Sequence, residues 1–231
     1  MARHFDGVDD LINAGTGASL ANLDPLTVCG WLYFVDLGAQ NYPRVLSKEA
    51  VLNEGIRIEV RRAATAGNIA FGRAQTTAQC YYNSVSSTIP FNAWRFVALQ
   101  YRSSASPRMR IFVGTPTALA TEVAYADTLD GTGTPVSDSA WPLRIGDSVD
   151  VIPWGGRLGY ISYIGAFLTL AEIQSIQFGI IPAHLMSDVK GFWPLWGVAT
   201  PEPDLSGNGN NGTVTGAVVA DGPPVGVYGP R

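Results

Sequence analysis

Three glutamates, Glu49, Glu54 and Glu59, follow one another at intervals of five residues. Hydrolysis of a glycosidic bond needs two carboxyl groups roughly 5 to 9 Å apart across a cleft. Side chains five residues apart on a β-strand point to opposite faces. The spacing therefore favours separate surface charges over a catalytic pair.

Other residues capable of covalent or metal chemistry are few. His4 and His184 are the only histidines, and no Gly-x-Ser-x-Gly turn supplies a nucleophile for them. Cys29 and Cys80 are the only cysteines, and their spacing with the histidines fits no familiar zinc site. We expect two free, buried thiols, with a single disulfide bridge as the alternative. We predict no catalytic residues, no metal site and no enzyme activity.

Aromatic side chains remain as candidates for ligand binding. Trp154 lies in a Pro- and Gly-containing segment, VIPWGGR, and is the tryptophan most expected to be exposed. Trp141, Tyr81 and Tyr82 are further candidates for platforms on which sugar rings stack. Packing in the core or a contact between subunits is the alternative interpretation of these rings.

Composition limits the class of protein. The chain has 231 residues, of which 46% are hydrophobic and 15% charged, so it can bury a sizeable core. The net charge is −4 and no basic run occurs, which gives no support for nucleic-acid binding. We recognise no signal peptide and no apolar run long enough to span a membrane.

Short β-like runs separated by Gly, Asn, Asp and Pro turns predict an all-β fold, a two-sheet antiparallel sandwich. In residues 56–62 the apolar side chains alternate with Arg57, Glu59 and Arg61, which predicts a strand with one polar face. Further strands are expected at 26–35, 68–73, 79–83, 94–101, 109–113, 143–146 and 158–167. Residues 128–139 are expected to form an exposed loop.

One short helix is predicted at residues 170–178. Thr169 and Glu172 have the spacing of a capping box, in which each side chain bonds to the backbone N–H of the other residue. Gly179 supplies the stop signal.

Three segments carry a resemblance to a known family. Residues 191–197 (GFWPLWG) and 204–217 (DLSGNGNNGTVTGA) lie near the end of the chain, whereas residues 5–15 (FDGVDDLINAG) lie near its start. They resemble the laminin-G-like family of concanavalin-A-type jelly rolls, in which the first two blocks come just before the third. The fragments LTVCGWLYF, VLSKEA, FNAWRFVALQYR, MRIFVG, LRIGD and GRLGYISYIGAFLTLAEIQSI resemble other parts of that family.

The resemblance implies a circularly permuted jelly roll over residues 1–220, followed by a Pro- and Gly-rich tail at 221–231. It also implies that residues 213–219 lie beside the N-terminal strand and that Trp193 packs in the core. Glucanases of this fold carry an E-x-D-x-x-E pattern, which is absent here.

A calcium site frequent in the family has lost its acidic residues here, since the matching segment is Leu-Gly-Tyr-Ile at 158–161. Asp6, Asp9, Asp10 and Asp147 remain as oxygen donors for calcium. We favour a structural role for the first three, in which they shape the turn around Gly7 through side-chain-to-backbone hydrogen bonds. No cofactor is therefore predicted.

The permuted block is also familiar from structural proteins of tailed bacteriophages. The resemblance thus implies a non-enzymatic, virion-associated protein of the capsid-decoration or tail type, whose partners are a capsid or tail protein and further copies of itself. A lectin-like carbohydrate-binding module, with a glycan as its ligand, is the alternative. The expected location is the virion, with the cytoplasm as the alternative.

Overall fold

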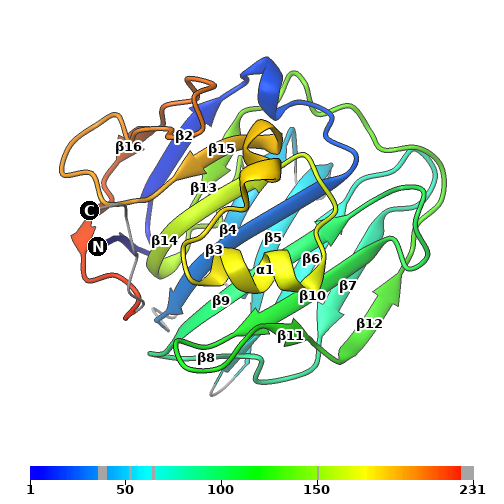
Figure 1. Cartoon of the computed structure of the whole chain (residues 1–231), viewed down its shortest axis with the longest axis horizontal. Helices are drawn as coiled ribbons and strands as arrows, with labels where there is room; N and C mark the ends of the chain where they lie inside the picture. The colour runs from blue at the N-terminus through cyan, green and yellow to red at the C-terminus, as the bar shows by residue number, and fades with distance from the viewer. Residues whose placement is uncertain (36–40, 52–53, 64–65, 150, 225–231) are drawn as a thin grey trace.

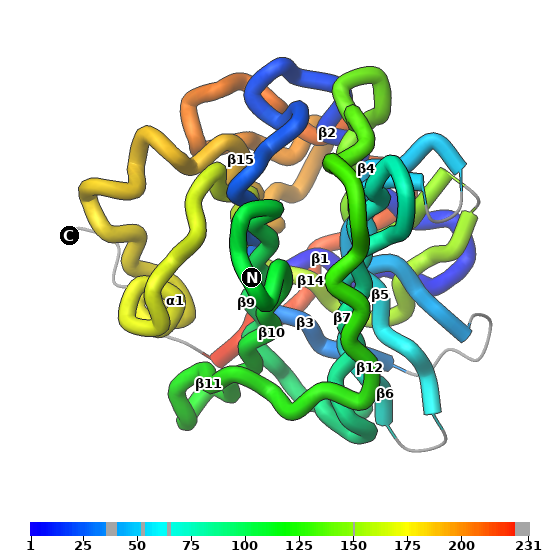
Figure 2. Tube along the Cα trace, turned by 90° about the vertical axis from the view of Figure 1, so that its right-hand side faces the viewer, coloured from blue at the N-terminus to red at the C-terminus, as the bar shows by residue number. Residues whose placement is uncertain are grey.

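The computed structural model describes residues 1–35, 41–51, 54–63, 66–149 and 151–224. They form two antiparallel β-sheets packed face to face, with a single α-helix among the described residues (Figure 1). Figure 2 shows the two layers side by side, with the helix outside one of them. The predicted all-β sandwich with one short helix is confirmed.

The eight-stranded sheet carries the longest strands. Its path is β11 (Thr121–Glu122), β10 (Met109–Gly114), β9 (Trp94–Tyr101), β3 (Leu26–Phe34), β14 (Gly155–Ile164), β1 (Ala2–Asp6) and β17 (Val218–Ala220), and β15 (Val189–Trp193) also pairs with β14.

The nine-stranded sheet forms the other layer. Its path is β12 (Tyr125–Leu129), β7 (Cys80–Ser84), β6 (Ala66–Arg73), β5 (Gly55–Arg62), β4 (Arg44–Glu49), β13 (Leu143–Ile145), β2 (Leu11–Gly15) and β16 (Thr213–Thr215), and β8 (Ile89–Pro90) pairs with β6.

Two apolar clusters hold these layers. The larger lies between the sheets, and the smaller lies between the outer face of the eight-stranded sheet and the segment that contains α1 (Leu170–Gln177) and the 3₁₀ helix η2 (Ala183–Asp188). A second 3₁₀ helix, η1 (Ala18–Leu20), follows β2. Because both faces of β3 are covered, its sequence is apolar throughout instead of alternating.

Helix α1 begins as predicted. The Thr169 hydroxyl accepts a hydrogen bond from the Glu172 N–H, and the Glu172 carboxylate accepts one from the Thr169 N–H at 2.7 Å. Gly179 follows with φ +80°, a conformation that favours glycine. The predicted capping box is therefore confirmed.

Strand β14 joins the two ends of the chain. Its first half pairs with β1 and its second half pairs with β15, so strands from opposite ends of the sequence lie along the same edge of β14. β17 then pairs with β1 and β16 pairs with β2. Trp193 is fully buried. The predicted positions of residues 213–219 and of Trp193 are confirmed.

The turn that begins at Asp204 is built around one carboxylate. Asp204 accepts hydrogen bonds from the N–H groups of Phe192, Ser206 and Asn210, each at 2.9 Å, and from the Ser206 hydroxyl. Asn211 accepts from the Asp204 N–H. These hydrogen bonds of Asp204 and Asn211 therefore fix the turn at residues 204–211 and connect it to β15.

A buried ion pair fastens the first strand to the same block. Arg3 Nε donates to Glu202 at 2.7 Å, and its two terminal nitrogens donate to the carbonyls of Ala217 and Ala199. The other Glu202 oxygen accepts from the Trp196 and Gly197 N–H groups. Each polar atom of the pair thus has a partner, which offsets the cost of burying the two charges.

Some expectations need correction. The loop expected at 128–139 is only partly exposed, because Asp138 is buried and accepts a hydrogen bond from the buried Lys48 ammonium group. Cys29 and Cys80 are free and buried, as predicted. No helix in the described part of the chain is long and apolar enough to cross a bilayer. Residues 225–231 of the predicted tail lie outside the described residues.

Candidate ligand-binding groove

The polar face of β5 forms the floor of the candidate site. Ile58 and its apolar neighbours on β5 pack between the sheets, whereas Arg57, Glu59 and Arg61 lie on the outer face of the nine-stranded sheet. The strict alternation predicted from the sequence produces this separation. The adjacent strand β4 adds Arg44 to the same face, and β7, which lies beyond β6, adds Tyr81.

Arg57 lies flat across a glycine of the next strand. A Cβ atom at Gly72 would lie 2.6 Å from the Arg57 guanidinium carbon, so only glycine leaves this path open. The guanidinium group reaches the Tyr81 ring, 5.2 Å from its centroid, and donates to Gln79 at 2.8 Å. Burial lowers the pKa of Arg57, partly offset by the charge of Glu59.

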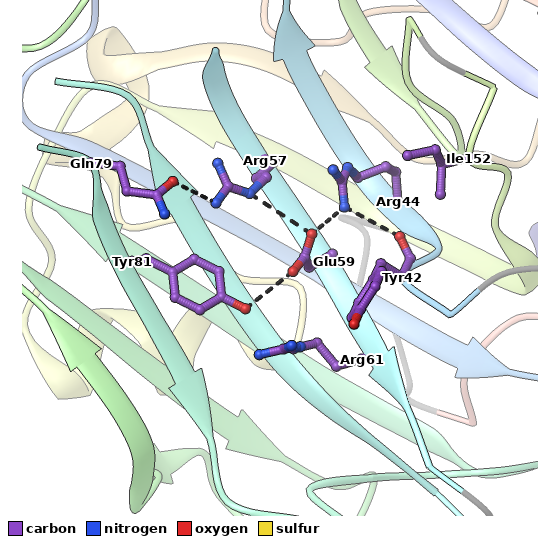
Figure 3. A pocket seen from close by; sticks show the side chains of 8 residues that line it. All are labelled: Tyr42, Arg44, Arg57, Glu59, Arg61, Gln79, Tyr81 and Ile152. Carbon is purple, nitrogen blue, oxygen red and sulfur yellow. Dashed lines mark hydrogen bonds and ion pairs between the residues drawn. The ribbon is translucent and has the colours of Figure 1, made fainter. Parts of the chain in front are cut away.

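Glu59 is the centre of a hydrogen-bond network (Figure 3). Its carboxylate accepts from Arg44 and from the Tyr81 hydroxyl, the latter at 3.1 Å, and lies 3.8 Å from Arg57 Nε. Burial, followed by the charge of Glu59, raises the pKa of Tyr81, which keeps this hydroxyl protonated as a donor. The network fixes the orientation of every side chain in it.

The expectation that the glutamates are separate surface charges is wrong for two of them. Arg44 also pairs with Glu49 at 3.3 Å, and both Glu49 and Glu59 are buried. Glu59 lies on β5 directly opposite Arg44, so strand pairing brings these two together. Glu49 lies on β4 itself, the strand that also carries Arg44, and the register of β4 is irregular between Arg44 and Leu46. Glu54 remains exposed.

Arg61 completes this end of the site. Its guanidinium group lies over the Tyr42 ring, 5.1 Å from the centroid, and a hydrogen bond with Tyr42 raises its pKa. Within the described ranges Arg61 is half-buried and has no carboxylate in ion-pair contact. Among the described residues that line this site, it is therefore the arginine without an ion-pair partner.

Two hollows lie along this face. The first has a volume of about 320 Å³ and is lined by Tyr42, Arg44, Arg57, Glu59, Arg61, Gln79, Tyr81 and Ile152 (Figure 3). The second has a volume of about 360 Å³ and is lined by Glu54, Ala74, Gln75, Gln79, Val136 and Trp141. Gln79 lines both, so the hollows adjoin there, and we call the two together the groove.

The structure separates the four aromatic candidates. Tyr81 and Trp141 lie in the groove, one in each hollow. Tyr82, the next residue along β7, points into the core, and its hydroxyl donates to Asp130. Trp141 covers Gly55, where a Cβ would lie 3.0 Å from the indole ring.

The expected exposure of Trp154 is wrong, because its side chain is fully buried. The VIPWGGR segment folds inward between the sheets, where the Trp154 ring packs against Phe34 with centroids 5.0 Å apart. Its backbone N–H donates to the Gly146 carbonyl at 2.7 Å. The Pro and Gly residues of this segment correctly indicated a turn, but they did not indicate whether its Trp side chain faces solvent or the core.

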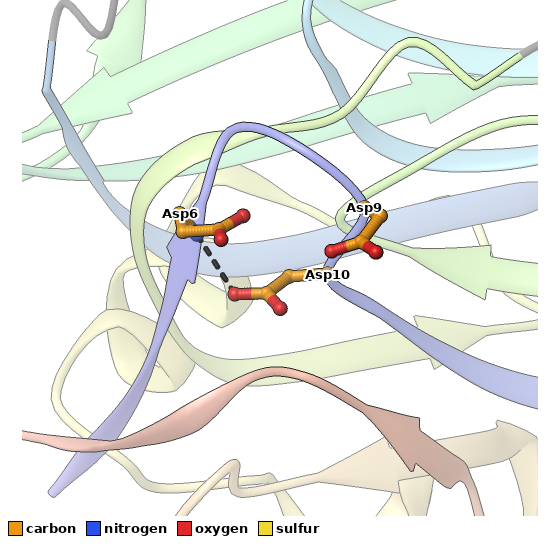
Figure 4. Close-up of side chains that lie close together, drawn as sticks. All are labelled: Asp6, Asp9 and Asp10. Atoms are coloured by element: carbon orange, nitrogen blue, oxygen red, sulfur yellow. Dashed lines mark hydrogen bonds between the residues drawn. The ribbon is translucent and has the colours of Figure 1, made fainter.

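Asp6, Asp9 and Asp10 form an acidic cluster, with carboxylate oxygens within 4.8 Å of one another (Figure 4). Asp10 accepts from the Asp6 N–H and Asp6 accepts from the Val8 N–H, both at 2.8 Å, around Gly7 at φ +78°. The predicted turn-shaping role is confirmed for Asp6 and Asp10. Asp147 accepts from the Ser148 N–H.

Sequence reasoning missed most of the groove. Arg44 and Gln79 carried no local signal, and Arg57, Glu59 and Arg61 were recognised only as the polar face of a strand. The usable indications were the alternation on β5 and the aromatic candidates Tyr81 and Trp141, which both lie in the groove. The remaining residues come from β4, from residue 79 just before β7, and from segments near residues 42 and 141, which the sequence does not place side by side.

Comparison with known proteins places the fold. No protein-family model matches the sequence, and no curated protein matches it significantly. A protein from Bacteroides ovatus described as carbohydrate-binding is similar in structure, with a TM-score of 0.62 and 16% identity, over 98% of this chain and 61% of that one. Tailspike protein 2 of Escherichia coli O157:H7 bacteriophage CAB120 is also similar in structure, with a TM-score of 0.58 and 8% sequence identity. The match covers 83% of this chain and 26% of the tailspike.

This chain therefore spans about three fifths of the Bacteroides protein and a quarter of the tailspike. At these identities the likeness establishes a shared β-sandwich architecture.

Proposed function

We propose that the chain is a non-catalytic carbohydrate-binding module and that the groove on the nine-stranded sheet is its binding site. The observation that carries the proposal is the placement of Tyr81 and Trp141 in adjoining hollows with Gln79 between them. Aromatic faces next to fixed hydrogen-bonding groups are the features of a site that orients a polar ligand. The fold likeness to a protein described as carbohydrate-binding supports this choice.

The two buried glutamates do not suit hydrolysis. The Glu49 side chain is fully buried, and Arg44 contacts both carboxylates. A general acid must be protonated and must reach the glycosidic oxygen. Arg44 engages both carboxylates, so neither is presented to a glycosidic oxygen. The pair therefore serves to hold Arg44 and the floor of the groove in place.

The test is glycan-array binding followed by calorimetry with the best ligand. Trp141→Ala and Tyr81→Ala should each weaken binding about tenfold or more, since each removes a stacking surface. Tyr33→Ala is the matched control, because Tyr33 is a half-buried tyrosine on the opposite sheet that also stacks on an arginine. Wild-type protein that binds no glycan, or groove variants that bind like the control, would contradict the proposal.

The laminin-G-like assignment and the virion setting belong to the same proposal. The permuted order of the blocks and the fold likeness to part of a phage tailspike support them. A role in assembly with a capsid or tail protein, or with further copies, is favoured by exposed apolar side chains around the C-terminal block: Met186, Val198, Leu205, Val218 and Val219. Co-purification with phage particles and light scattering test this second role without reference to glycans.

A further inference from the structure

Among the described residues, the first hollow of the groove has more cations than anions. Arg44, Arg57 and Arg61 face Glu49 and Glu59, so three positive charges meet two negative charges. The chain as a whole carries −4. The described side chains of the first hollow thus have a net charge opposite in sign to that of the whole chain.

The three arginines differ in how far their charge is already neutralised. Arg44 contacts both carboxylates. One terminal nitrogen of Arg57 donates a hydrogen bond to the Gln79 side chain. The other terminal nitrogen, Nη1, is buried with no hydrogen-bond partner among the described residues. Leaving a buried donor unpaired costs about 1 to 3 kcal/mol. Proteins keep such a cost mainly where a water, an ion or a ligand completes the site.

Arg61 supplies the accessible cation. The Tyr42 ring supports its guanidinium group, and no ion pair joins it to a carboxylate among the described residues. Figure 3 shows Arg61 on the same side of Glu59 as the Tyr81 hydroxyl. An arginine held flat presents two parallel N–H donors, a geometry that matches the two oxygens of a carboxylate or sulfate group.

We propose that the first hollow binds an acidic sugar, with the carboxylate or sulfate of the ligand on Arg61 and the Arg57 charge behind it. The neutral sugars of the same chain then extend past Gln79 toward Trp141. This inference rests on the proposed function and names the class of glycan. An anion in this position supplies the missing counter-charge and so offsets the desolvation that lowers the pKa of Arg57.

The experiment compares an acidic oligosaccharide with its uncharged ester and with a sulfated oligosaccharide. Trigalacturonate, its methyl ester and a sulfated galactose oligosaccharide are titrated into the full chain by calorimetry at 50 mM and 500 mM salt. We expect the acid to bind at least tenfold more tightly than the uncharged ester, and the difference to shrink at high salt. A preference for the sulfated or the carboxylated ligand identifies which oxyanion the site takes.

Two arginine variants locate the effect. Arg61→Gln should abolish the preference for the acid. Arg61→Lys should retain only part of that preference, because lysine keeps the positive charge but lacks the two parallel N–H donors of the guanidinium group. Arg157→Gln is the matched control, since Arg157 is also half-buried and lies over Tyr33 on the other sheet, 5.0 Å from the ring centroid. Thermal melts confirm that each variant is folded.

The possible failures are distinct. Equal binding of acid and ester overturns the inference and leaves the proposed function standing. Equal loss of preference in Arg61→Gln and Arg157→Gln also overturns it, because the effect would then come from the overall field of the protein. If no glycan of any charge binds, both the inference and the proposed function fail.

Discussion

At the scale of single residues, the geometry of the groove depends on a missing side chain. Arg57 crosses β6 where Gly72 leaves room for its guanidinium group, and this crossing brings it to Tyr81 and Gln79. A methyl group at position 72 would occupy that path. The binding face is therefore specified as much by a glycine as by its charged residues.

We expect Gly72→Ala to displace Arg57 and break its hydrogen bond to Gln79. Placing a side chain in a packed site costs about 1 to 3 kcal/mol, so the melting temperature should fall while the fold persists. Affinity for an acidic glycan should fall with it. Ala63→Gly is the control, because Ala63 is exposed and lies outside the groove. Gly207→Ala is unsuitable, because Gly207 has φ +85° and an alanine there would be strained. Unchanged affinity in Gly72→Ala would mean that Arg57 does not support the site.

Asp204 gives a residue-scale prediction about pH. Burial alone would raise its pKa, but hydrogen bonds from Phe192, Ser206 and Asn210 outweigh burial and hold the pKa below its ordinary value of 3.8. A depressed folded pKa stabilises the protein above the unfolded value, and this stabilisation is lost as the pH falls through the folded value.

Asp204→Asn should therefore lower the free energy of unfolding at pH 7 by about 2 kcal/mol, with a smaller difference from wild type at pH 3. Urea denaturation at the two pH values measures this. Asp221→Asn, at an exposed position, serves as the control. A difference that stays constant between pH 7 and pH 3 would contradict the assigned pKa shift.

At the scale of elements, the Arg3–Glu202 ion pair connects β1 to the block that contains β15, β16 and β17. Arg3→Leu leaves Glu202 buried without its cation, and removal of one partner of a buried pair costs about 3 to 5 kcal/mol. The double variant Arg3→Leu, Glu202→Met removes both charges and should recover much of that loss. A double-mutant cycle by urea unfolding measures the coupling, and additive losses would show that the two side chains do not act together.

The same scale shows what the sequence can predict. Strands with an alternating or wholly apolar pattern, such as β5 and β3, were recognised because burial leaves a period in the sequence. β12 was missed because it is exposed along most of its length and so lacks such a period. The groove was largely missed because strand order and register decide which side chains meet, and neither can be read from one strand. Trp154 was misplaced because turn residues do not say which way a loop folds.

At the scale of the whole molecule, the pairing of C-terminal strands with N-terminal ones predicts which truncations the sandwich tolerates. A chain ending after Gly191 loses most of the block that pairs with β1, β2 and β14 and leaves their edges unpaired. We expect it to be unfolded or aggregated, whereas a chain ending after Asp221 should melt within a few degrees of the full protein. Circular dichroism and thermal melts compare the two. A soluble 1–191 chain with a cooperative melt would show that the block is an appendage.

The pairing of the two ends also sets the order of events during synthesis. Arg3 bonds to Ala217, a partner 214 residues further along the chain. A ribosome adds about 5 to 20 residues per second, so the first strand waits some tens of seconds before its neighbour exists. Contacts this distant in sequence slow folding, because a long loop must close before they form. The nascent chain must therefore keep the unpaired edge of β1 from pairing with other chains until β17 has been synthesised.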